Sequence, residues 1–388
     1  MVIEPKIRNN VCLTAHPTGC ALQVRDMIRF TRRGKKLAGP RAALIIGASN
    51  GYGMGARVAA AYGCGAATLG VAFERPSSET KIGTAGFYND RAFLAYAAED
   101  GIPAWSLNGD AFSGEIKHEA LELIRRRMGP VDLVVYSIAA PRRLDPATGT
   151  LHSSVIKPIG SPYTARTVDF LTGQVSPVTV QPASPEEIQD TVKVMGGEDW
   201  RLWLETLRRA GLLAPGATTV AFSYIGPAFT AAIYRDGTMG RAKEHLEATA
   251  RELDRELAAS GGRALVSVNK ALVTRASAVI PAVPLYIAVL YKVMKARGLH
   301  ESCLQQELRL FGDFLYNGSA PALDPEGRIR LDDREMRPEV QEEVARLMEL
   351  ANSENIERIS DIAGFREEFL RHHGFGRPDV DYAADVQP

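Results

Sequence analysis

The chain has 388 residues, of which 45% are hydrophobic and 24% are charged. These proportions are typical of a globular protein and exclude collagen-like, low-complexity and intrinsically disordered classes. Lys and Arg together number 46, as do Asp and Glu, so the formal net charge is zero. A dedicated nucleic-acid-binding protein usually carries a basic excess, so we expect no nucleic-acid partner.

The cysteines and the N-terminus indicate the cellular compartment. Four cysteines are too few for a disulfide scaffold, and their spacing fits no zinc-ligand pattern: Cys12, Cys20, Cys64 and Cys303. We therefore expect reduced thiols, a cytoplasmic location and no metal. The first ten residues, MVIEPKIRNN, lack the apolar core of a secretory signal.

One uncharged segment resembles a membrane span. Residues 276–291 (ASAVIPAVPLYIAVLY) contain no charge over 16 residues. A bilayer requires about 20 apolar residues, and Pro281 and Pro284 interrupt this run. We expect a buried or pocket-lining loop followed by a helix, and no stable membrane insertion.

Short β-rich runs alternate with helix-length segments along the chain. The runs are 42–46, 67–73, 104–107, 131–138, 218–224 and 264–269, and the helical segments are 55–61, 91–99, 116–128, 199–209 and 240–259. This alternation predicts the α/β class, with a Rossmann-type doubly wound parallel sheet. Such sheets bind ligands at the carboxyl ends of their strands.

The alternation does not fill the chain. We expect one Rossmann-type domain over 1–388, with a core at about 41–320 and additions at 1–40, 141–198 and 320–388. The middle addition is rich in Pro, Ser and Thr and predicts loops or hairpins, whereas the last predicts helices near 338–352 and 359–370.

A glycine-rich turn follows the first strand: Gly47, Ala48, Ser49, Asn50, Gly51, Tyr52 and Gly53. A strand, a glycine turn and a helix together form a phosphate cradle, because the backbone can approach a pyrophosphate and the helix N-terminus offers free N–H groups. Glu74 lies 21 residues after Gly53, where a carboxylate can accept hydrogen bonds from the adenosine ribose and repel a 2′-phosphate. This favours NADH over NADPH, although the adjacent Arg75 could reach a 2′-phosphate.

Two later strand ends could complete the nucleotide site. Asp110 and Ala111 follow the third run, where the carboxylate could meet the adenine edge. Ile138 and Ala139 end the fourth run and could let a ribose or nicotinamide lie close. The sequence therefore predicts a dinucleotide at this edge of the sheet.

The same turn permits a second interpretation. Gly47-x-Ser49-x-Gly51 also fits the nucleophile elbow of α/β-hydrolases, with a triad ending at His372 or His373. A hydrolase elbow normally follows several strands, however, and only the nucleotide interpretation explains Gly53 and Glu74. We favour the dinucleotide site over the hydrolase and over a purely structural turn.

A tyrosine and a lysine follow the fifth strand. A phenol can donate a hydrogen bond to an oxyanion as hydride arrives, and an ammonium can hold the cofactor ribose and acidify the phenol. Tyr234 and Lys243 are nine residues apart and would point in opposite directions on one continuous helix. If they cooperate, Tyr234 must lie on a loop or turn, with a new helix starting near Thr238. Spacing alone leaves a core tyrosine and a surface lysine equally open.

Several blocks together resemble the FabV-type enoyl-acyl carrier protein reductases, also called trans-2-enoyl-CoA reductases, of the short-chain dehydrogenase/reductase superfamily. The blocks are CLTAHPTGC, GASNGYG, FERPSSETKIGTAGFYN, NGDAFS, VDLVVYSIAAPRR, VMGGEDW, Tyr234-x8-Lys243 and the C-terminal GFG…VDYAADV. The resemblance thus extends over the whole chain. It departs at Asn50, where Thr is expected, and at Ile225-Gly226-Pro227, which replace a more polar stretch.

The resemblance implies an NADH-dependent bacterial oxidoreductase of fatty-acid biosynthesis that reduces the 2,3-double bond of 2-enoyl thioesters on acyl carrier protein or coenzyme A. It implies that Tyr234 is the catalytic tyrosine, Lys243 its cofactor-binding partner and Tyr224 a substrate contact. The implied nucleotide contacts are Gly47, Ala48, Ser49, Asn50, Gly51, Tyr52, Phe73, Glu74, Asp110, Ala111, Ile138, Ala139, Lys243, Leu272, Val273 and Thr274. Residues 276–291 would line the acyl pocket.

The family is usually monomeric, and its C-terminal region has at times been labelled flavin-binding. Residues 320–388 contain no glycine turn after a strand, so we expect no flavin. Two other functions stay open: an NAD(P)H-dependent reductase of another carbonyl or alkene, and a non-enzymatic NAD sensor on the same fold.

Overall fold

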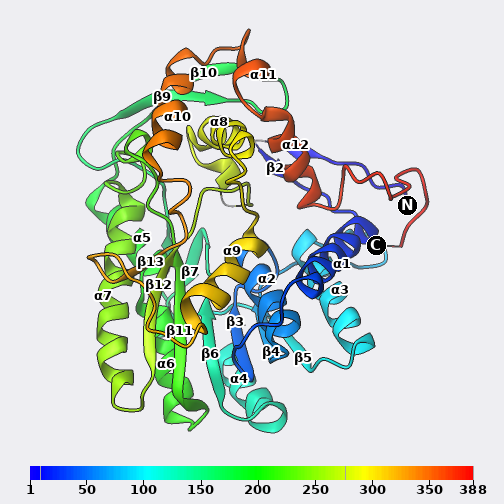
Figure 1. Cartoon of the computed structure of the whole chain (residues 1–388), viewed down its shortest axis with the longest axis vertical. Helices are drawn as coiled ribbons and strands as arrows, with labels where there is room; N and C mark the ends of the chain where they lie inside the picture. The colour runs from blue at the N-terminus through cyan, green and yellow to red at the C-terminus, as the bar shows by residue number, and fades with distance from the viewer. Residues whose placement is uncertain (9, 276, 388) are drawn as a thin grey trace.

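A parallel sheet of seven strands forms the centre of the molecule (Figure 1). The computed structural model describes residues 1–8, 10–275 and 277–387. In spatial order the strands are β5 (Ala104–Asn108), β4 (Ala67–Ala72), β3 (Ala42–Ile46), β6 (Val131–Tyr136), β11 (Leu213–Ser223), β12 (Arg263–Val268) and β13 (Arg328–Arg330). All neighbouring pairs are parallel.

The order of the strands confirms the doubly wound prediction. Within this sheet the chain enters at β3, moves outward through β4 to β5, and returns to β6 on the other side of β3. The carboxyl ends of β3 and β6 therefore flank a topological switch point, where such sheets bind ligands. All six predicted runs are strands of this sheet. The seventh, β13, lies beyond the expected core boundary of 320 and was not predicted, because three residues give no usable periodicity.

Alternate side chains of each strand enter two different cores. Leu44 and Ile46 pack with α4 (Gly114–Arg127), α6 (Glu198–Arg209) and α7 (Thr238–Ala258). Ala43 and Ile45 pack on the opposite face with the elements α2 (Gly51–Val58), η1 (Ala59–Cys64) and η4 (Leu310–Leu315). Burial on both faces explains why these strands are continuously apolar in sequence.

The additions contain more regular structure than expected. Two helices of more than ten residues were not predicted there, α1 (Pro17–Arg33) and α5 (Pro185–Met195). Each starts with a proline after a capping side chain, His16 for α1 and Ser184 for α5. The middle addition does contain the expected hairpins, β7 (Arg142–Leu144) with β8 (Leu151–Ser153) and β9 (Tyr163–Val168) with β10 (Val175–Val180).

A cap covers the carboxyl edge of the sheet. In Figure 1 it forms the upper part of the molecule, where β9 and β10 lie beside α8 and the C-terminal helices. Its elements are η2 (Ala228–Thr230), η3 (Ser277–Val279), α8 (Val283–Ala296), α10 (Pro338–Leu350), α11 (Ile356–Ile359) and α12 (Ile362–Arg371). One hydrophobic cluster joins the cap to Tyr52, Tyr224 and Leu272, which follow β3, β11 and β12. The cap therefore encloses the strand ends at which a ligand is expected.

The uncharged segment 276–291 belongs to this cap. Ala276 lies outside the described residues, η3 follows it, and α8 begins at Val283. Every residue of α8 from Val283 to Tyr291 is buried, in agreement with the predicted loop and helix. Within the described ranges, no helix has the length and apolar character of a membrane span.

The two ends of the chain lie side by side (Figure 1). The backbone of Met1 pairs with that of Val386, and His16 N–H donates to the His373 carbonyl at 2.8 Å. The remaining elements are the hairpin β1 (Ile7–Arg8) and β2 (Val11–Cys12), α3 (Ala85–Glu99) and α9 (Cys303–Arg309). The N-terminal addition is thus anchored to the cap.

Candidate active site

The glycine turn is closely packed against the neighbouring strands. Gly47 has φ +89°, and a Cβ there would lie 2.1 Å from the carbonyl oxygen of Ser137, after β6. A Cβ on Gly53 would lie 2.0 Å from the Gly47 carbonyl oxygen. Glycine is therefore required at both positions, because any side chain would displace the backbone.

The N-terminus of α2 is directed out of this turn. Asn50 is its N-cap in an extended conformation, but its side chain makes no capping hydrogen bond. The first backbone N–H groups of α2 therefore lack a side-chain acceptor and suit an anion such as a pyrophosphate. One turn further along the helix, Gly55 lets α2 approach α9 closely, because a Cβ at this position would lie 3.3 Å from the Cys303 backbone.

Glu74 joins the turn to more distant parts of the chain. Its carboxylate accepts hydrogen bonds from Ser49 Oγ at 2.7 Å and from Asn50 Nδ2 at 3.3 Å. Arg275 Nη1 contacts both carboxylate oxygens, at 3.1 and 3.2 Å. The backbone of Glu74 is fixed by the side-chain amide of Asn108, which accepts the Glu74 N–H and donates to the Glu74 carbonyl. The sequence singled out Glu74 but missed Arg275, which lies 201 residues further along the chain.

The other predicted nucleotide contacts differ in their exposure. Phe73 is 78% exposed beside Glu74, so one face of its ring is free for a ligand. Asp110 accepts the N–H of Phe112 in a local turn, and Ala111 is buried. Ala139 is exposed after β6, while Ile138 is half-buried. These residues follow β4, β5 and β6 and therefore lie along one edge of the sheet.

The last predicted stretch reaches the same turn. A Cβ on Gly51 would lie 3.8 Å from Thr274 Cγ2, so the segment after β12 borders α2. Leu272 and Val273 are buried, and Val273 N–H donates to Tyr291 Oη at 3.0 Å. The side chain of Tyr52 is turned inward and donates to the Lys270 carbonyl at 2.7 Å. Only the backbone of Tyr52 can therefore face a nucleotide.

Tyr234 lies in a turn before α7, which begins at Thr238, as the spacing argument requires. Its carbonyl accepts the N–H of Gly240 at 2.9 Å, which fixes the turn against the first residues of the helix. Lys243 is half-buried and donates to the Phe222 carbonyl at 3.3 Å. The two side chains make no hydrogen bond with each other, but both belong to the region at the end of β11.

Burial changes the acidity of this pair. It raises the pKa of Tyr234 above its ordinary value, so the phenol stays protonated at neutral pH. Desolvation lowers the pKa of Lys243 to about 8, although the charge of Glu247 partly offsets this effect. The site thus holds a neutral hydrogen-bond donor and an ammonium that titrates near physiological pH.

The two tyrosines are in direct contact. The rings of Tyr224 and Tyr234 meet edge to face, with centroids 5.0 Å apart and an interplanar angle of 71°. Gly226 has φ +75°, and a Cβ there would lie 2.9 Å from Tyr224 Oη. The departure at 225–227 therefore has a steric consequence, because only glycine lets this loop fold over the hydroxyl.

The geometry does not support the hydrolase alternative. Ser49 Oγ donates to Glu74, not to a histidine. His372 Nε2 contacts the Val273 carbonyl, and His373 Nδ1 contacts the Phe369 carbonyl. Neither histidine is hydrogen-bonded to Ser49, so no nucleophile–base pair forms.

The structure also bears on whether the chain holds a metal site or a flavin site. Among the residues described, no three or more His, Cys, Asp or Glu side chains are grouped as metal ligands. In the C-terminal region, β13 leads into the turn 331–336 and then α10, with no glycine between Arg328 and Arg337. This connection does not fit the glycine turn that cradles a dinucleotide.

Three family models match successive parts of the chain. The model for the trans-2-enoyl-CoA reductase catalytic region matches residues 81–316. The model for the NAD(P)H binding domain of trans-2-enoyl-CoA reductase matches residues 2–79, and that for an enoyl reductase FAD binding domain matches residues 323–386.

Named relatives are similar over the full length. An enoyl-[acyl-carrier-protein] reductase [NADH] of Opitutus terrae is 54% identical and a trans-2-enoyl-CoA reductase [NADH] of Ruminiclostridium cellulolyticum is 51% identical; each comparison covers 100% of this chain and at least 98% of the relative. The crystal structure of Treponema denticola trans-2-enoyl-CoA reductase in complex with NAD is 48% identical, with a TM-score of 0.96, and covers 100% of this chain and 98% of that one. The Clostridium acetobutulicum enzyme in complex with NADH is 42% identical with a TM-score of 0.97 and the same coverage.

Proposed function

Because the chain belongs to the trans-2-enoyl-CoA reductase family, we propose that it reduces trans-2-enoyl thioesters to saturated acyl thioesters with NADH. The thioester would be carried by acyl carrier protein or coenzyme A, and the reaction would be the last step of fatty-acid elongation. The full-length similarity to named reductases carries this proposal. It is supported by the position of two tyrosines at the same sheet edge as the glycine turn.

The residues around the glycine turn fit NADH. The backbone from Gly47 to Tyr52 would receive the pyrophosphate, and Glu74 the adenosine ribose hydroxyls. Phe73 would contact the adenine, together with Asp110 and Ala111. Ile138, Ala139 and the stretch Leu272, Val273 and Thr274 would enclose the nicotinamide end. Bound NADH would supply the hydride that reaches C3 of the enoyl group.

Tyr234 would stabilise the charge that develops at the thioester oxygen. Its buried, protonated hydroxyl can donate a hydrogen bond to that oxygen as the C2–C3 double bond is broken. Tyr224, in contact with Tyr234, would contribute a second hydroxyl. C2 would then take up a proton from solvent, so one hydride and one proton would be consumed for each double bond reduced.

Lys243 would hold the nicotinamide ribose with its ammonium group. Its present acceptor, the Phe222 carbonyl, lies near the end of β11, two residues before Tyr224. A positive charge here would also make transient negative charge on the phenol less costly. Lys243 is needed in its charged form in both roles.

The cap would receive the acyl chain. The buried apolar residues of α8 lie in the same hydrophobic cluster as Tyr224 and Tyr234. We further propose that the enzyme requires no flavin, because the connection between β13 and α10 does not fit a nucleotide cradle, and that it requires no metal. By analogy with the family, we propose a monomer that works in the cytoplasm.

The absorbance of NADH with crotonyl-CoA, and in parallel with an enoyl-acyl carrier protein, tests the proposal. Tyr234→Phe should lower kcat by about 10² or more, because one oxyanion donor typically contributes that much. NADH affinity, measured by fluorescence titration, should be nearly unchanged.

Tyr96→Phe provides a matched control. Tyr96 is a half-buried tyrosine of α3, away from the carboxyl edge, and its hydroxyl makes no hydrogen bond within the described residues. It should keep wild-type activity. NADH binding without enoyl-dependent oxidation of either substrate would contradict the proposal.

A further inference from the structure

Two of the sequence blocks, NGDAFS and VMGGEDW, meet in the folded chain, although only the first has a role in the proposed cofactor site. NGDAFS joins β5 to α4, and VMGGEDW joins α5 to α6. Asp199 of VMGGEDW is 1% exposed, and its Oδ1 accepts a hydrogen bond from Lys117 Nζ of α4 at 2.7 Å. These two side chains form a buried ion pair next to Ala111, one of the proposed adenine contacts.

The ammonium group of Lys117 holds the backbone of the β5–α4 connection. It donates to Asp199, to the Ala111 carbonyl at 2.8 Å and to the Phe112 carbonyl at 3.0 Å. An ammonium has three N–H donors, so all of them are used. Trp203, one turn after Asp199 on α6, donates its indole N–H to the same Ala111 carbonyl at 3.1 Å. The backbone at Ala111 is therefore held from both α4 and α6.

The orientation of Asp110 depends on this backbone. Its Oδ1 accepts the N–H of Phe112 at 3.0 Å, and its carbonyl accepts the Ser113 hydroxyl at 2.8 Å. The residue whose N–H orients the Asp110 carboxylate is thus the one whose carbonyl Lys117 holds. A shift of Lys117 would therefore change the direction of the carboxylate at the carboxyl end of β5.

Asp199 also reaches a second strand end of the cofactor site. Its Oδ2 accepts the hydroxyl of Tyr136 at 3.2 Å. Tyr136 is the last residue of β6 and precedes Ile138 and Ala139, which are proposed to enclose the nicotinamide end. One carboxylate therefore connects the ends of β5 and β6, which are separated in the sheet by β3 and β4.

Stability alone does not explain the charges of this pair. Transfer of an ammonium and a carboxylate out of water is costly, and apolar residues in place of a buried ion pair are often equally stable or more stable. A fully hydrogen-bonded polar network instead fixes one arrangement of the groups that it joins. The groups joined by Lys117 and Asp199 are the strand ends at which the cofactor is expected.

We propose that Lys117 and Asp199 are positioning residues for the adenine end of the NADH site. The pair fixes the β5–α4 connection, so that the carboxylate of Asp110 can accept a hydrogen bond from the adenine amino group. Hydride leaves from the other end of the nucleotide, so the pair acts on cofactor affinity and not on the chemical step. This inference rests on the proposed function and adds two residues to its cofactor site.

The experiment compares cofactor fragments in wild type and Lys117→Met. NADH affinity is measured by fluorescence titration, and bound NADH is displaced by ADP-ribose, which lacks the nicotinamide, or by reduced nicotinamide mononucleotide, which lacks the adenosine. Lys117→Met should weaken NADH and ADP-ribose by about fivefold or more, the effect of losing one well-made hydrogen bond. The affinity for the mononucleotide, and kcat for crotonyl-CoA at saturating NADH, should match those of wild type.

A double variant separates positioning from stability. Lys117→Met alone leaves the Asp199 carboxylate buried without its cation and should lower Tm. Adding Asp199→Asn removes the second charge, and the amide keeps an acceptor for the Tyr136 hydroxyl. Tm should then recover, whereas the affinity for ADP-ribose should stay low. Recovery of ADP-ribose affinity together with Tm would show that the pair serves stability only, and would overturn the inference.

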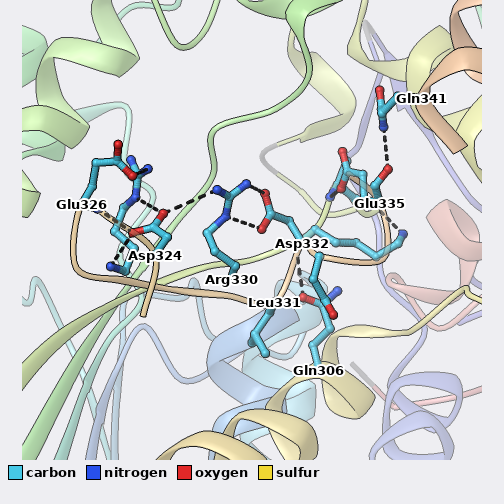
Figure 2. A network of polar contacts seen from close by, with 12 residues as sticks. Gln306, Asp324, Glu326, Arg330, Leu331, Asp332, Glu335 and Gln341 are labelled. Carbon is cyan, nitrogen blue, oxygen red and sulfur yellow. Dashed lines mark hydrogen bonds and ion pairs between the residues drawn. The ribbon is translucent and has the colours of Figure 1, made fainter. Parts of the chain in front are cut away.

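Asp332→Asn is the matched control. Asp332 is also 1% exposed, and Figure 2 shows it held by Arg330, whose Nε and Nη2 donate to its carboxylate at 2.7 Å each. It follows β13, at the opposite edge of the sheet from β5, so this variant should keep the wild-type affinity for ADP-ribose.

Two results would overturn the inference alone. The first is an equal loss of affinity for ADP-ribose and for the mononucleotide in Lys117→Met, and the second is an unchanged affinity for ADP-ribose. NADH binding to wild type without enoyl-dependent oxidation would instead contradict the proposed function, and the fragment titrations would still test the pair because they need no thioester.

Discussion

Replacement of Glu74 by Gln tests how the enzyme selects its cofactor. The side chain of Glu74 is 7% exposed and held by Ser49, Asn50 and Arg275, so its charge is fixed at the place proposed for the adenosine ribose. Two unit charges about 4 Å apart interact by about 4 kcal/mol at an effective dielectric constant of about 20. A 2′-phosphate would therefore be disfavoured by up to about 10³-fold.

Arg275 reduces this discrimination. Its guanidinium contacts the carboxylate, but it is 48% exposed and therefore screened by solvent. We therefore expect the enzyme to prefer NADH over NADPH by about 10²-fold. Glu74→Gln should weaken NADH about tenfold, through the loss of charge-assisted hydrogen bonds, and should improve kcat/KM for NADPH by at least tenfold.

The assay is the ratio of kcat/KM for NADH to that for NADPH, measured with crotonyl-CoA. Arg275→Gln should shift the ratio in the opposite direction, because it removes the only cation paired with Glu74 within the described residues. Glu79→Gln, in the same loop but exposed, is the matched control and should leave the ratio unchanged. A ratio in Glu74→Gln within twofold of wild type would refute the electrostatic reasoning.

Two further predictions concern the tyrosine region. Because Lys243 must be charged and its pKa is about 8, kcat/KM for NADH should fall as pH rises above that value. Lys243→Arg should move this decline to higher pH. A decline at the same pH in Lys243→Arg would exclude Lys243 as its source. The folded-state pKa of Lys243 is below its ordinary value, so this group binds fewer protons in the folded enzyme, and its contribution to the free energy of unfolding should increase from about pH 8 to about pH 10.5. Gly226→Ala places a methyl group 2.9 Å from Tyr224 Oη in a left-handed conformation, and should lower kcat and destabilise the fold by about 1–3 kcal/mol. If Gly226→Ala binds NADH with wild-type affinity in a fluorescence titration, the loss of kcat arises on the thioester side of the site. An unchanged kcat would show that this loop can move to accommodate the methyl group.

The sequence by itself determined the features that depend on neighbouring residues. Continuous apolar runs indicated the strands, because both faces of a parallel sheet are buried. The glycine turn required glycine at Gly47 and Gly53 for steric reasons, and the two glycines between Tyr234 and Lys243 indicated the break before α7. Resemblance to a family added roles for these residues that no local pattern could supply.

Only the tertiary structure decided which distant residues meet. Arg275 reaches Glu74 across 201 residues, and Glu335 reaches Ala271 across 64. Neither contact has a sequence signal, because one charged residue in a charged segment looks like any other until packing removes it from water. The strand β13 is similar, since its three residues become a strand only by pairing with β12. Burial and long-range pairing are properties of the folded chain, so only the folded chain shows these contacts.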